Sequence, residues 1–231
     1  MKFISVIPAR AGSKGIKNKN IFKVGNKPLI EHTFYTVTKS DIKQNFVLTD
    51  SLKIKKIAKK FDIISDYIRP KKLSGSKVSL ADTLFDFHLW LNKKNIYYDY
   101  MVILQPTSPL RSYKDINNSI KIIKKDKSMS LFSISESLEH PYETIIKKKK
   151  NWKFVLNKSK KFHRRQDFDI ETFFINGAIY ISNRKLIQIK KTFKHNKHSF
   201  YKMPKNRSLE INDKEEAYII DSILKRSKSE N

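Results

Sequence analysis

Hydrophobic residues along the chain occur in two patterns that alternate with each other. Short apolar runs, rich in isoleucine, valine and phenylalanine, predict β-strands, and apolar residues three or four positions apart predict helices. The predicted strands lie at residues 2–7, 46–49, within 63–68, and at 100–104, 131–135, 173–181 and 200–203. The predicted helices lie at residues 28–39, 52–61, 79–91, 115–124, 184–189 and 214–224. This order favours an α/β fold with a mostly parallel sheet and helices on both faces.

One stretch does not follow this alternation. Residues 140–170 are polar, basic and aromatic without a helical period, and we expect them to form a hairpin or arm that leaves the main body. Residues 225–231 predict a disordered tail. A chain of 231 residues has the size of one α/β domain. We therefore expect a single domain over residues 1–231, with a protruding arm at about 140–170.

Composition excludes several classes of protein. Hydrophobic residues make up 39% of the chain, which is enough for a core, and no apolar run approaches the roughly 20 residues that a membrane helix needs. The apolar run at residues 1–7 is too short for a signal peptide, and we expect a cytoplasmic protein. The chain has no cysteine, which excludes disulfides, thiolate metal ligands and a cysteine nucleophile.

The formal net charge is +27, from 49 basic and 22 acidic residues, and such a charge is typical of nucleic-acid-binding proteins. Only eight of the basic residues are arginines, however, and the lysines are spread along the whole chain. An RNA-binding module would need clustered arginines and stacking aromatics on one face, whereas the aromatics here sit mainly at core positions. We therefore predict a solvated basic surface that steers anionic substrates, with no nucleic-acid partner and no membrane partner.

The loop after the first predicted strand combines small and cationic residues. In an open α/β sheet, ligands bind beyond the carboxyl ends of the strands, which is where this loop lies. Small residues let backbone N–H groups approach phosphate oxygens, and cationic residues supply positive charge. The small residues are Ala11, Gly12, Ser13 and Gly15, and the cationic ones are Arg10, Lys14 and Lys19. The loop matches neither the Walker A pattern nor Gly-x-Gly-x-x-Gly, and it is either a triphosphate-binding loop or a surface loop with glycine turns.

A second unusual loop follows the central strand. Its sequence, Gln105-Pro106-Thr107-Ser108-Pro109, places a proline on each side of two hydroxyl residues. The prolines stiffen the turn, and Thr107 and Ser108 would then point into the crevice at the strand ends. The alternative is a proline turn with only a structural role.

Further motifs accompany these two loops. In chain order the set lies at residues 7–15, 19–20, 27–30, 49–51, 69–70, 104–111, 140–141, 164–167 and 176–181. In order and spacing this set resembles the CMP-sialic acid synthetase (acylneuraminate cytidylyltransferase) family. The resemblance covers about residues 2–224, and the number of ordered matches makes it highly specific.

The resemblance implies a Rossmann-like nucleotidyltransferase sheet and an enzyme that joins CMP from CTP to a nonulosonic (sialic-type) sugar acid. The anomeric hydroxyl of the sugar would attack the α-phosphorus of CTP and release pyrophosphate, with Mg²⁺ as the cofactor. By resemblance, the nucleotide-binding residues are Arg10, Ala11, Gly12, Ser13, Lys19, Asn20 and Arg69. Arg10 and Lys19 would face the phosphates, and we assign them as the catalytic residues.

The resemblance also implies a sugar site and a partner subunit. The residues that match sugar-binding positions are Gln105, Thr107, Ser108 and Arg165. In this family the arm swaps across a homodimer, and Arg165 would then serve the partner's site. We therefore expect a homodimer that binds CTP and a nonulosonic sugar acid.

The expected metal site departs from the family pattern. Relatives carry two aspartates, spaced Asp-x-Asp, just before the last helix, whereas this chain has Glu210-Ile211-Asn212. Alternation places Glu210 and Asn212 on one face of an extended segment, and we assign both as Mg²⁺ ligands. Asn212 offers a neutral carbonyl, and the site loses one charge. Two alternatives stay open: Asp213 as a substitute ligand, and Asn212-Asp213 as a cap of the final helix.

Two positions near the expected sugar also differ from sialate-specific relatives. A lysine that some relatives have two residues after His140-Pro141 is Glu143 here, and an arginine two residues before the Asn-Gly pair is Phe174. Both changes remove positive charge. They favour a nonulosonic acid other than N-acetylneuraminate, such as a legionaminate- or pseudaminate-type sugar.

Other functions stay open at this stage. A cytidylyltransferase for 3-deoxy-octulosonate is one, although those relatives generally carry an aspartate-containing motif in place of Gln105-Pro106-Thr107. An inactive homologue with a structural role is another, because of the altered pair Glu210 and Asn212. Asp50 is either a general base or a buried strand-end aspartate that accepts hydrogen bonds from loop amides.

Overall fold

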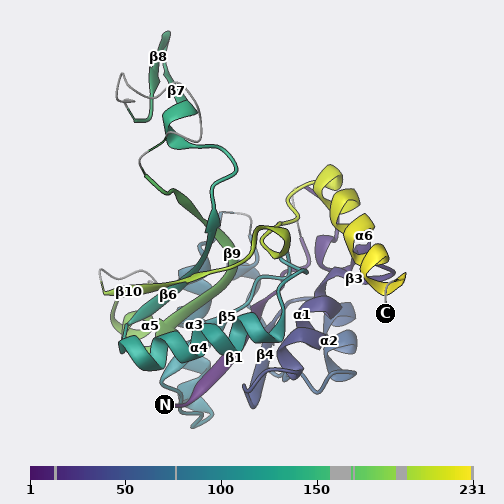
Figure 1. The fold of residues 1–231 in the computed structure, drawn as a ribbon. Helices are drawn as coiled ribbons and strands as arrows, with labels where there is room; N and C mark the ends of the chain where they lie inside the picture. The colour runs from purple at the N-terminus through teal and green to yellow at the C-terminus, as the bar shows by residue number, and fades with distance from the viewer. Residues whose placement is uncertain (13–14, 76, 157–167, 169, 191–196, 230–231) are drawn as a thin grey trace.

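The computed structural model describes residues 1–12, 15–75, 77–156, 168, 170–190 and 197–229. Its centre is a six-stranded sheet with helices on both faces (Figure 1). In spatial order the strands are β10 (His198–Lys202), β6 (Ser130–Glu136), β9 (Phe173–Asn183), β5 (Tyr100–Ile103), β1 (Phe3–Pro8) and β4 (Gln44–Leu48). The predicted α/β fold is confirmed.

The sheet is mostly parallel, as the alternation of elements predicted. β1 runs parallel to both of its neighbours, β4 and β5, and β10 runs parallel to β6. β9 is the exception, because it runs antiparallel to both β5 and β6. The strand predicted within 63–68 does not form. Ile64 and Ile68 make only isolated bridges to Phe46 and Thr49, because the chain leaves the sheet edge between these two points.

Six α-helices lie in the described part of the chain. They are α1 (Leu29–Thr38), α2 (Leu52–Lys59), α3 (Leu80–Lys93), α4 (Tyr113–Asp126), α5 (Arg184–Lys190) and α6 (Lys214–Ser229). Ser51, Ser79 and Ser112 each accept a hydrogen bond from a backbone N–H in the first turn of the helix that follows, which fixes where α2, α3 and α4 begin. Residues 225–229 are helical rather than part of a disordered tail, and an ion pair of 2.6 Å between Asp221 and Lys225 links the last turns.

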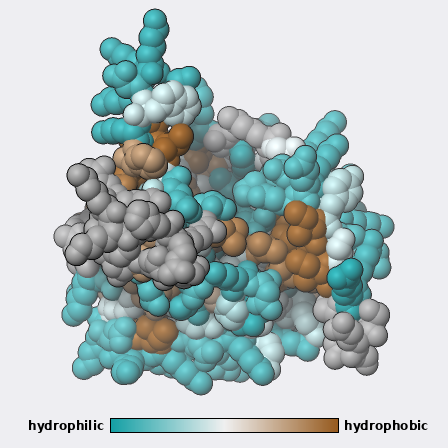
Figure 2. All heavy atoms as spheres, turned by 45° about the horizontal axis from the view of Figure 1, so that its top comes forward, coloured by the Kyte–Doolittle hydropathy of each residue, from teal (hydrophilic) through white to brown (hydrophobic). Residues whose placement is uncertain are grey.

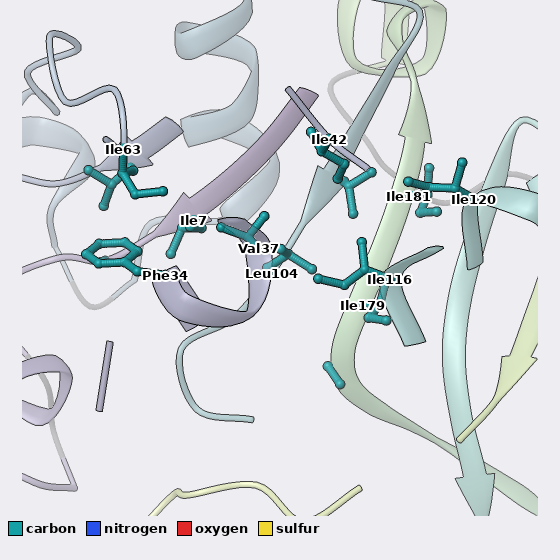
Figure 3. Close-up of a cluster of buried hydrophobic side chains, with 14 of the residues drawn as sticks. Ile7, Phe34, Val37, Ile42, Ile63, Leu104, Ile116, Ile120, Ile179 and Ile181 are labelled. Atoms are coloured by element: carbon teal, nitrogen blue, oxygen red, sulfur yellow. The ribbon is translucent and has the colours of Figure 1, made fainter. Parts of the chain in front are cut away.

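The core lies on both faces of the sheet, because successive strand residues point to opposite sides. Ile7 and Val47 are buried in a cluster that includes residues of α1, α2 and α4. Their neighbours Val6 and Phe46 are buried in a second cluster with residues of α3 and α5. Figure 3 shows side chains of the first cluster pointing toward one another from the sheet and the helices. The sheet is thereby held rigid, and its strand ends present their loops in fixed positions.

Smaller elements complete the described structure. They are the paired strands β2 (Lys23–Val24) and β3 (Lys27–Pro28), the paired strands β7 (Ile145–Lys148) and β8 (Asn151–Phe154), and the 3₁₀ helices η1 (Lys19–Ile21), η2 (Lys71–Leu73), η3 (Pro141–Glu143) and η5 (Lys205–Arg207). The β7–β8 hairpin stands away from the sheet at the top of Figure 1, and every residue of its two strands is exposed. None of the helices in the described residues combines the length and apolar character that a membrane crossing requires.

Candidate active site

A cavity of about 410 Å³ lies at the carboxyl ends of β1 and β5, and we call it the first cavity. The residues predicted for the site that line it are Arg10, Lys19, Asn20, Arg69, Gln105 and Thr107. They come from the loop after β1 (residues 9–20, the first loop), from the segment before η2, and from the loop after β5 (residues 105–111, the central loop). These loops meet because the parallel strands β1 and β5 end at the same edge of the sheet.

The first loop is fixed at its start by a carboxylate. Asp50 accepts a hydrogen bond of 2.7 Å from the backbone N–H of Ala11, and the side-chain amide of Asn20 donates to the carbonyl of Arg10 at 2.9 Å. Of the two roles predicted for Asp50, the hydrogen bond to a loop amide is therefore present, although Asp50 is exposed rather than buried. Gly12 is also exposed and lies beside the first cavity without lining it, and the predicted residue Ser13 lies outside the described residues.

Lys19 joins the first loop to the end of the chain. Its Nζ donates a hydrogen bond of 3.0 Å to the backbone carbonyl of Ile211. Burial lowers the pKa of Lys19, and the carboxylates of Glu210 and Glu216 oppose that shift. The positive charge of Lys19 can therefore interact both with a phosphate group in the first cavity and with the carboxylates of Glu210 and Glu216.

Two arginines that line the first cavity are held by hydrogen bonds to the η2 segment. Nε and Nη2 of Arg69 both donate to the carbonyl of Leu73, at 3.0 and 2.6 Å, and Nη2 also donates to Thr83 at 3.1 Å. Arg10 donates to the carbonyl of Ser74 at 3.4 Å. Burial lowers the pKa of Arg69, and nearby Asp50 opposes this shift. The short η2 segment thus orients both guanidinium groups toward the cavity.

Arg111 holds the central loop in place through hydrogen bonds to backbone carbonyls. It is only 2% exposed, and its Nη1 donates to the carbonyls of Gln105 and Ala178, at 3.2 and 2.7 Å. Its Nη2 donates to Thr33 of α1 at 2.9 Å. Burial lowers its pKa to about 10. One buried guanidinium therefore ties the central loop to β9 and to α1.

Replacing Arg111 with methionine should lower the free energy of unfolding by about 3 kcal/mol, because the buried carbonyl of Ala178 and the partly buried carbonyl of Gln105 lose their donor. Urea unfolding followed by circular dichroism measures this change. Arg226→Met, at an exposed position of α6, is the matched control and should leave the unfolding midpoint almost unchanged. Equal midpoints for the two variants would contradict the role given to Arg111.

The two hydroxyls of the central loop have different surroundings. Thr107 lines the first cavity, and its Oγ1 donates a hydrogen bond of 2.7 Å to Oε1 of Glu210. Ser108 is 1% exposed, and within the described residues its Oγ has no hydrogen-bond partner. Direct contact between Ser108 and a ligand therefore requires some opening of the loop, whereas Thr107 is accessible as it stands.

Glu210 lies between the central loop and β9. Besides the bond from Thr107 to its carboxylate, the backbone N–H of the next residue, Ile211, donates to the carbonyl of Thr107 at 2.8 Å. On the other side, a Cβ added to Gly177 would lie 3.4 Å from Oε2 of Glu210, and Gly177 has a φ of +71°. Glycine suits this position because of its positive φ, and the carboxylate of Glu210 packs directly against it.

The residues after Glu210 begin the last helix. Glu216 accepts hydrogen bonds from the backbone N–H groups of Asn212 and Asp213, at 2.5 and 3.3 Å, and Asp213 accepts one from the N–H of Glu216 at 2.9 Å. This reciprocal arrangement is a capping box. Asp213 therefore serves as a helix cap, while the side chain of Asn212 lines a second cavity together with Glu210 and Glu216.

An ion pair between the partly exposed Arg207 and a buried aspartate supports this segment. Arg207, just before it, donates to Asp115 of α4 through Nη2 at 2.8 Å and through Nε at 3.1 Å. Asp115 is fully buried. Burial alone would raise its pKa, but hydrogen bonds from Arg207, Ser112 and Tyr201 outweigh burial and hold the pKa below its usual range. The segment that carries Glu210 is therefore anchored to the body at both ends.

The donor groups near Glu210 are of the kind that Mg²⁺ binds. Glu210 and Glu216 offer carboxylate oxygens and Asn212 an amide oxygen, and all three line the second cavity. Within the described residues, no group of three or more His, Cys, Asp and Glu side chains could hold a metal ion. Mg²⁺ usually keeps several waters and binds through one or two carboxylates and substrate phosphates, and these donors are compatible with such coordination.

Sequence analysis missed two residues of this region. Glu216 could have been found, because Asp213-x-x-Glu216 has the spacing of a capping box. Tyr180 of β9 is half-buried near Gln105 and Glu210. Burial raises the pKa of its hydroxyl, and the negative charge of Glu210 raises this pKa further. No sequence signal distinguished Tyr180, because the apolar run 173–181 does not reveal which residues face the site. Arg165, which was predicted to bind the sugar, lies outside the described residues.

A mostly parallel sheet with a cationic cavity at its strand ends is the arrangement of a nucleotide-binding α/β protein. Comparison with known proteins gives the family: residues 4–222 match the family described as Cytidylyltransferase, and the chain belongs to that family. The resemblance to acylneuraminate cytidylyltransferases is also confirmed. An N-acylneuraminate cytidylyltransferase of Streptococcus agalactiae is 32% identical over 94% of this chain.

Two further proteins are similar to the chain. A CMP-N,N'-diacetyllegionaminic acid synthase of Legionella pneumophila is 31% identical over 84% of this chain and 83% of that protein. A solved structure of a CMP:2-keto-3-deoxy-manno-octonic acid synthetase in complex with CTP has the same fold, with a TM-score of 0.73 at 14% identity over 98% of this chain and 100% of that one. The chain spans about half of the streptococcal relative, 52% of its length.

Proposed function

We propose that the protein transfers CMP from CTP to a nonulosonic sugar acid and releases pyrophosphate. The observation that supports this most directly is the first cavity, where Arg10, Lys19 and Arg69 lie around one space at the strand ends. Three cations in one cavity suit a nucleoside triphosphate, which carries a charge of about −4. Family membership and the relatives named above support CTP as the nucleotide and a sugar acid as the acceptor.

The reaction needs positioning and charge neutralisation rather than a covalent intermediate. The anomeric hydroxyl oxygen forms a bond to the α-phosphorus, the bond from that phosphorus to the bridging oxygen breaks, and pyrophosphate leaves with the electron pair. The hydroxyl proton passes to solvent. Arg10 and Lys19 hold the phosphates, with the first-loop residues Ala11, Gly12, Ser13 and Asn20 around them, and Arg69 lies beside the cytosine.

The acceptor lies on the side of the central loop. Gln105 and Thr107 orient it, because both line the first cavity close to Lys19. Glu210, assisted by Asn212, would hold Mg²⁺, which when bound supplies positive charge to the phosphates and polarises the α-phosphoryl group. The departures Glu143 and Phe174 favour an acid other than N-acetylneuraminate.

We further propose that the working unit is a homodimer in which the arm, with Arg165, reaches the site of the partner. The exposed apolar side chains of the hairpin support this, because Ile145, Trp152 and Phe154 are 51%, 60% and 55% exposed in the single chain. Sedimentation equilibrium should give a mass near twice 27.3 kDa. A monomer mass at micromolar concentration would contradict the dimer.

Pyrophosphate release by the pure protein tests the reaction. Each of the four nucleoside triphosphates is offered with Mg²⁺ against a panel of nonulosonic acids and 3-deoxy-octulosonate. We expect release only with CTP, and only with one type of nonulosonic acid. Release with 3-deoxy-octulosonate alone would identify that acid as the acceptor in place of a nonulosonic acid. Absence of release with every pair would favour an inactive homologue, with the altered pair Glu210 and Asn212 as the cause.

A further inference from the structure

A cavity of about 490 Å³ lies at the edge of the sheet opposite the first cavity, and we call it the basal cavity. The start of β1, the turn before β4 and the helix α4 line it. Because β1 and β4 are parallel, their amino ends meet here, while their carboxyl ends lead to the first loop and to Asp50. Figure 1 shows this edge at the bottom of the sheet, near the label N. The six residues of β1 separate the two cavities by roughly 20 Å, and the cavities are therefore distinct sites.

Lysines supply most of the charge around the basal cavity. They are Lys2 before β1, Lys43 before β4, and Lys121 and Lys124 of α4, and the acidic residue in the described lining is Asp41. Four lysines and one aspartate leave a net charge of +3 around this space. In the described part of the chain, none of the four lysines forms an ion pair. The positive charge of the basal cavity is therefore not balanced by the chain itself.

The arrangement of these lysines distinguishes them from the rest of the surface. A net charge of +27 places lysines along the whole chain, and Figure 2 shows a face that is largely hydrophilic. At the basal cavity, by contrast, three segments far apart in the sequence bring their lysines around one hollow. A cleft lined by one sign of charge attracts counter-ions more strongly than an open surface does. Lysine binds phosphate as a point charge, and the cavity thus suits a ligand with several phosphate oxygens.

The rest of the wall is suited to a different kind of group. Phe3, Ile42 and Ile120 also line the basal cavity, and Ile42 and Ile120 are only 4% and 7% exposed. Gln44 lies beside them, and within the described residues its buried Oε1 has no hydrogen-bond partner. The side chain of Gln44 is only partly buried and can turn this oxygen toward a ligand. Because an unpaired buried acceptor is costly, a ligand that brings an N–H or O–H group gains from pairing with it.

We propose that the basal cavity binds a nucleoside triphosphate at a site separate from the reaction. The four lysines hold the phosphates, and the base lies against Ile42 and Ile120 with a donor group at Gln44. The volume of the cavity is within the usual range of about 300–1,000 Å³ for small-molecule sites. Inorganic phosphate and pyrophosphate have the charge but lack the ring. The site is independent of the proposed reaction, since none of its lining residues lines the first cavity.

Calorimetric titration of the protein with CTP at low salt counts the nucleotide sites per chain and tests the proposal. We expect the wild-type protein to bind one more CTP per chain than Lys121→Met/Lys124→Met. Each lost lysine should weaken the basal site by about 10-fold, the effect of one hydrogen bond to a charged group. The matched control is Lys53→Met/Lys56→Met. These two lysines are exposed, lie three positions apart on α2 as the test pair does on α4, and carry the same charge. The control should bind as much CTP as the wild type.

Gln44→Leu gives a readout that a structural role would not produce. An acceptor without a partner contributes no hydrogen bond to the free protein, and its removal should leave the urea midpoint unchanged or raise it. The same change should weaken CTP binding at the basal site by severalfold, because the base loses its acceptor. Unchanged CTP binding in Gln44→Leu would contradict the contact with the base.

Equal numbers of CTP sites in the wild type, in Lys121→Met/Lys124→Met and in the control would overturn the basal site, and the lysines would then be a solvated surface. Pyrophosphate that binds there as tightly as CTP would also overturn the proposal, because phosphate groups alone would explain the binding. Lys19→Met should weaken CTP binding at the first cavity and leave the basal site intact. A protein without turnover whose CTP binding is lost only in Lys121→Met/Lys124→Met would reject the proposed reaction and retain the basal site.

Discussion

Replacing Lys19 with methionine is expected to lower kcat/KM for CTP by about 100-fold or more, the size seen when one positioned charge-stabilising group is lost. Methionine keeps an unbranched apolar stem of similar length but removes the charge. Lys19 lines the first cavity, and its Nζ donates to the carbonyl of Ile211, next to Glu210. The variant therefore loses both a cation for the phosphates and the bond that joins the first loop to the segment of Glu210.

Lys17→Met is the matched control for that change. Lys17 lies in the same loop, is exposed and does not line the first cavity. Its loss removes one charge from a surface of net charge +27 and should reduce kcat/KM by about twofold or less, through weaker steering alone. Pyrophosphate release at several salt concentrations separates the two effects. If both variants lost kcat/KM equally and in a strongly salt-dependent way, Lys19 would act only through the overall electrostatic field of the protein.

Gly15→Ala is expected to lower kcat by about 100-fold, because small misplacements of catalytic groups have effects of that order. A Cβ added to Gly15 would lie 2.3 Å from the backbone carbonyl oxygen of Asn212 and 3.5 Å from its carbonyl carbon. Real Cβ atoms do not approach backbone so closely, and either the first loop or the segment 210–213 must move. Such a shift separates Lys19 and the phosphates from Glu210.

The control for Gly15→Ala is Gly75→Ala, where the nearest atom to an added Cβ is the Val78 side chain at 3.6 Å, an ordinary contact. We expect Gly75→Ala to retain most of the activity. The Mg²⁺ concentration for half-maximal rate should rise in Gly15→Ala and stay unchanged in Gly75→Ala, while both variants unfold cooperatively in urea. Full activity of Gly15→Ala would show that the two segments can move apart without harm to the reaction.

The pattern of the sequence was sufficient for most of the secondary structure. Short apolar runs predicted β1 and β4, and continuous runs suit strands that are covered on both faces. In the structure Val6 and Phe46 are buried on one face and Ile7 and Val47 on the other. The prediction within 63–68 failed because a short apolar run has the same composition whether it forms a strand or only touches a sheet edge at two points. The tail prediction failed over 225–229 because polar residues also suit an exposed helix.

For the candidate site too, the sequence predicted some features and not others. The composition of the first loop and the central loop identified Arg10, Lys19 and Thr107 without any structure, since strand ends in an α/β sheet are where ligands bind. Gln105 was identified by the resemblance to the family. Gly15 and Gly177 were visible as residues, but the sequence did not show that the backbone of Asn212 approaches Gly15 or that Gly177 has a positive φ beside Glu210. Their partners, Asn212 and Glu210, lie far away in the chain.

The sequence by itself determined the class of fold, the family, the cations at the end of β1 and the hydroxyl residues at the end of β5, because these depend on local periodicity and on motifs within one loop. Only the tertiary structure decided that Thr107 bonds Glu210, 103 residues away, and that Lys19 bonds the carbonyl of Ile211, 192 residues away. Those contacts depend on strand order, on the reversed direction of β9 and on how α6 docks. Local sequence patterns do not predict such long-range contacts, because each contact depends on how the whole chain packs.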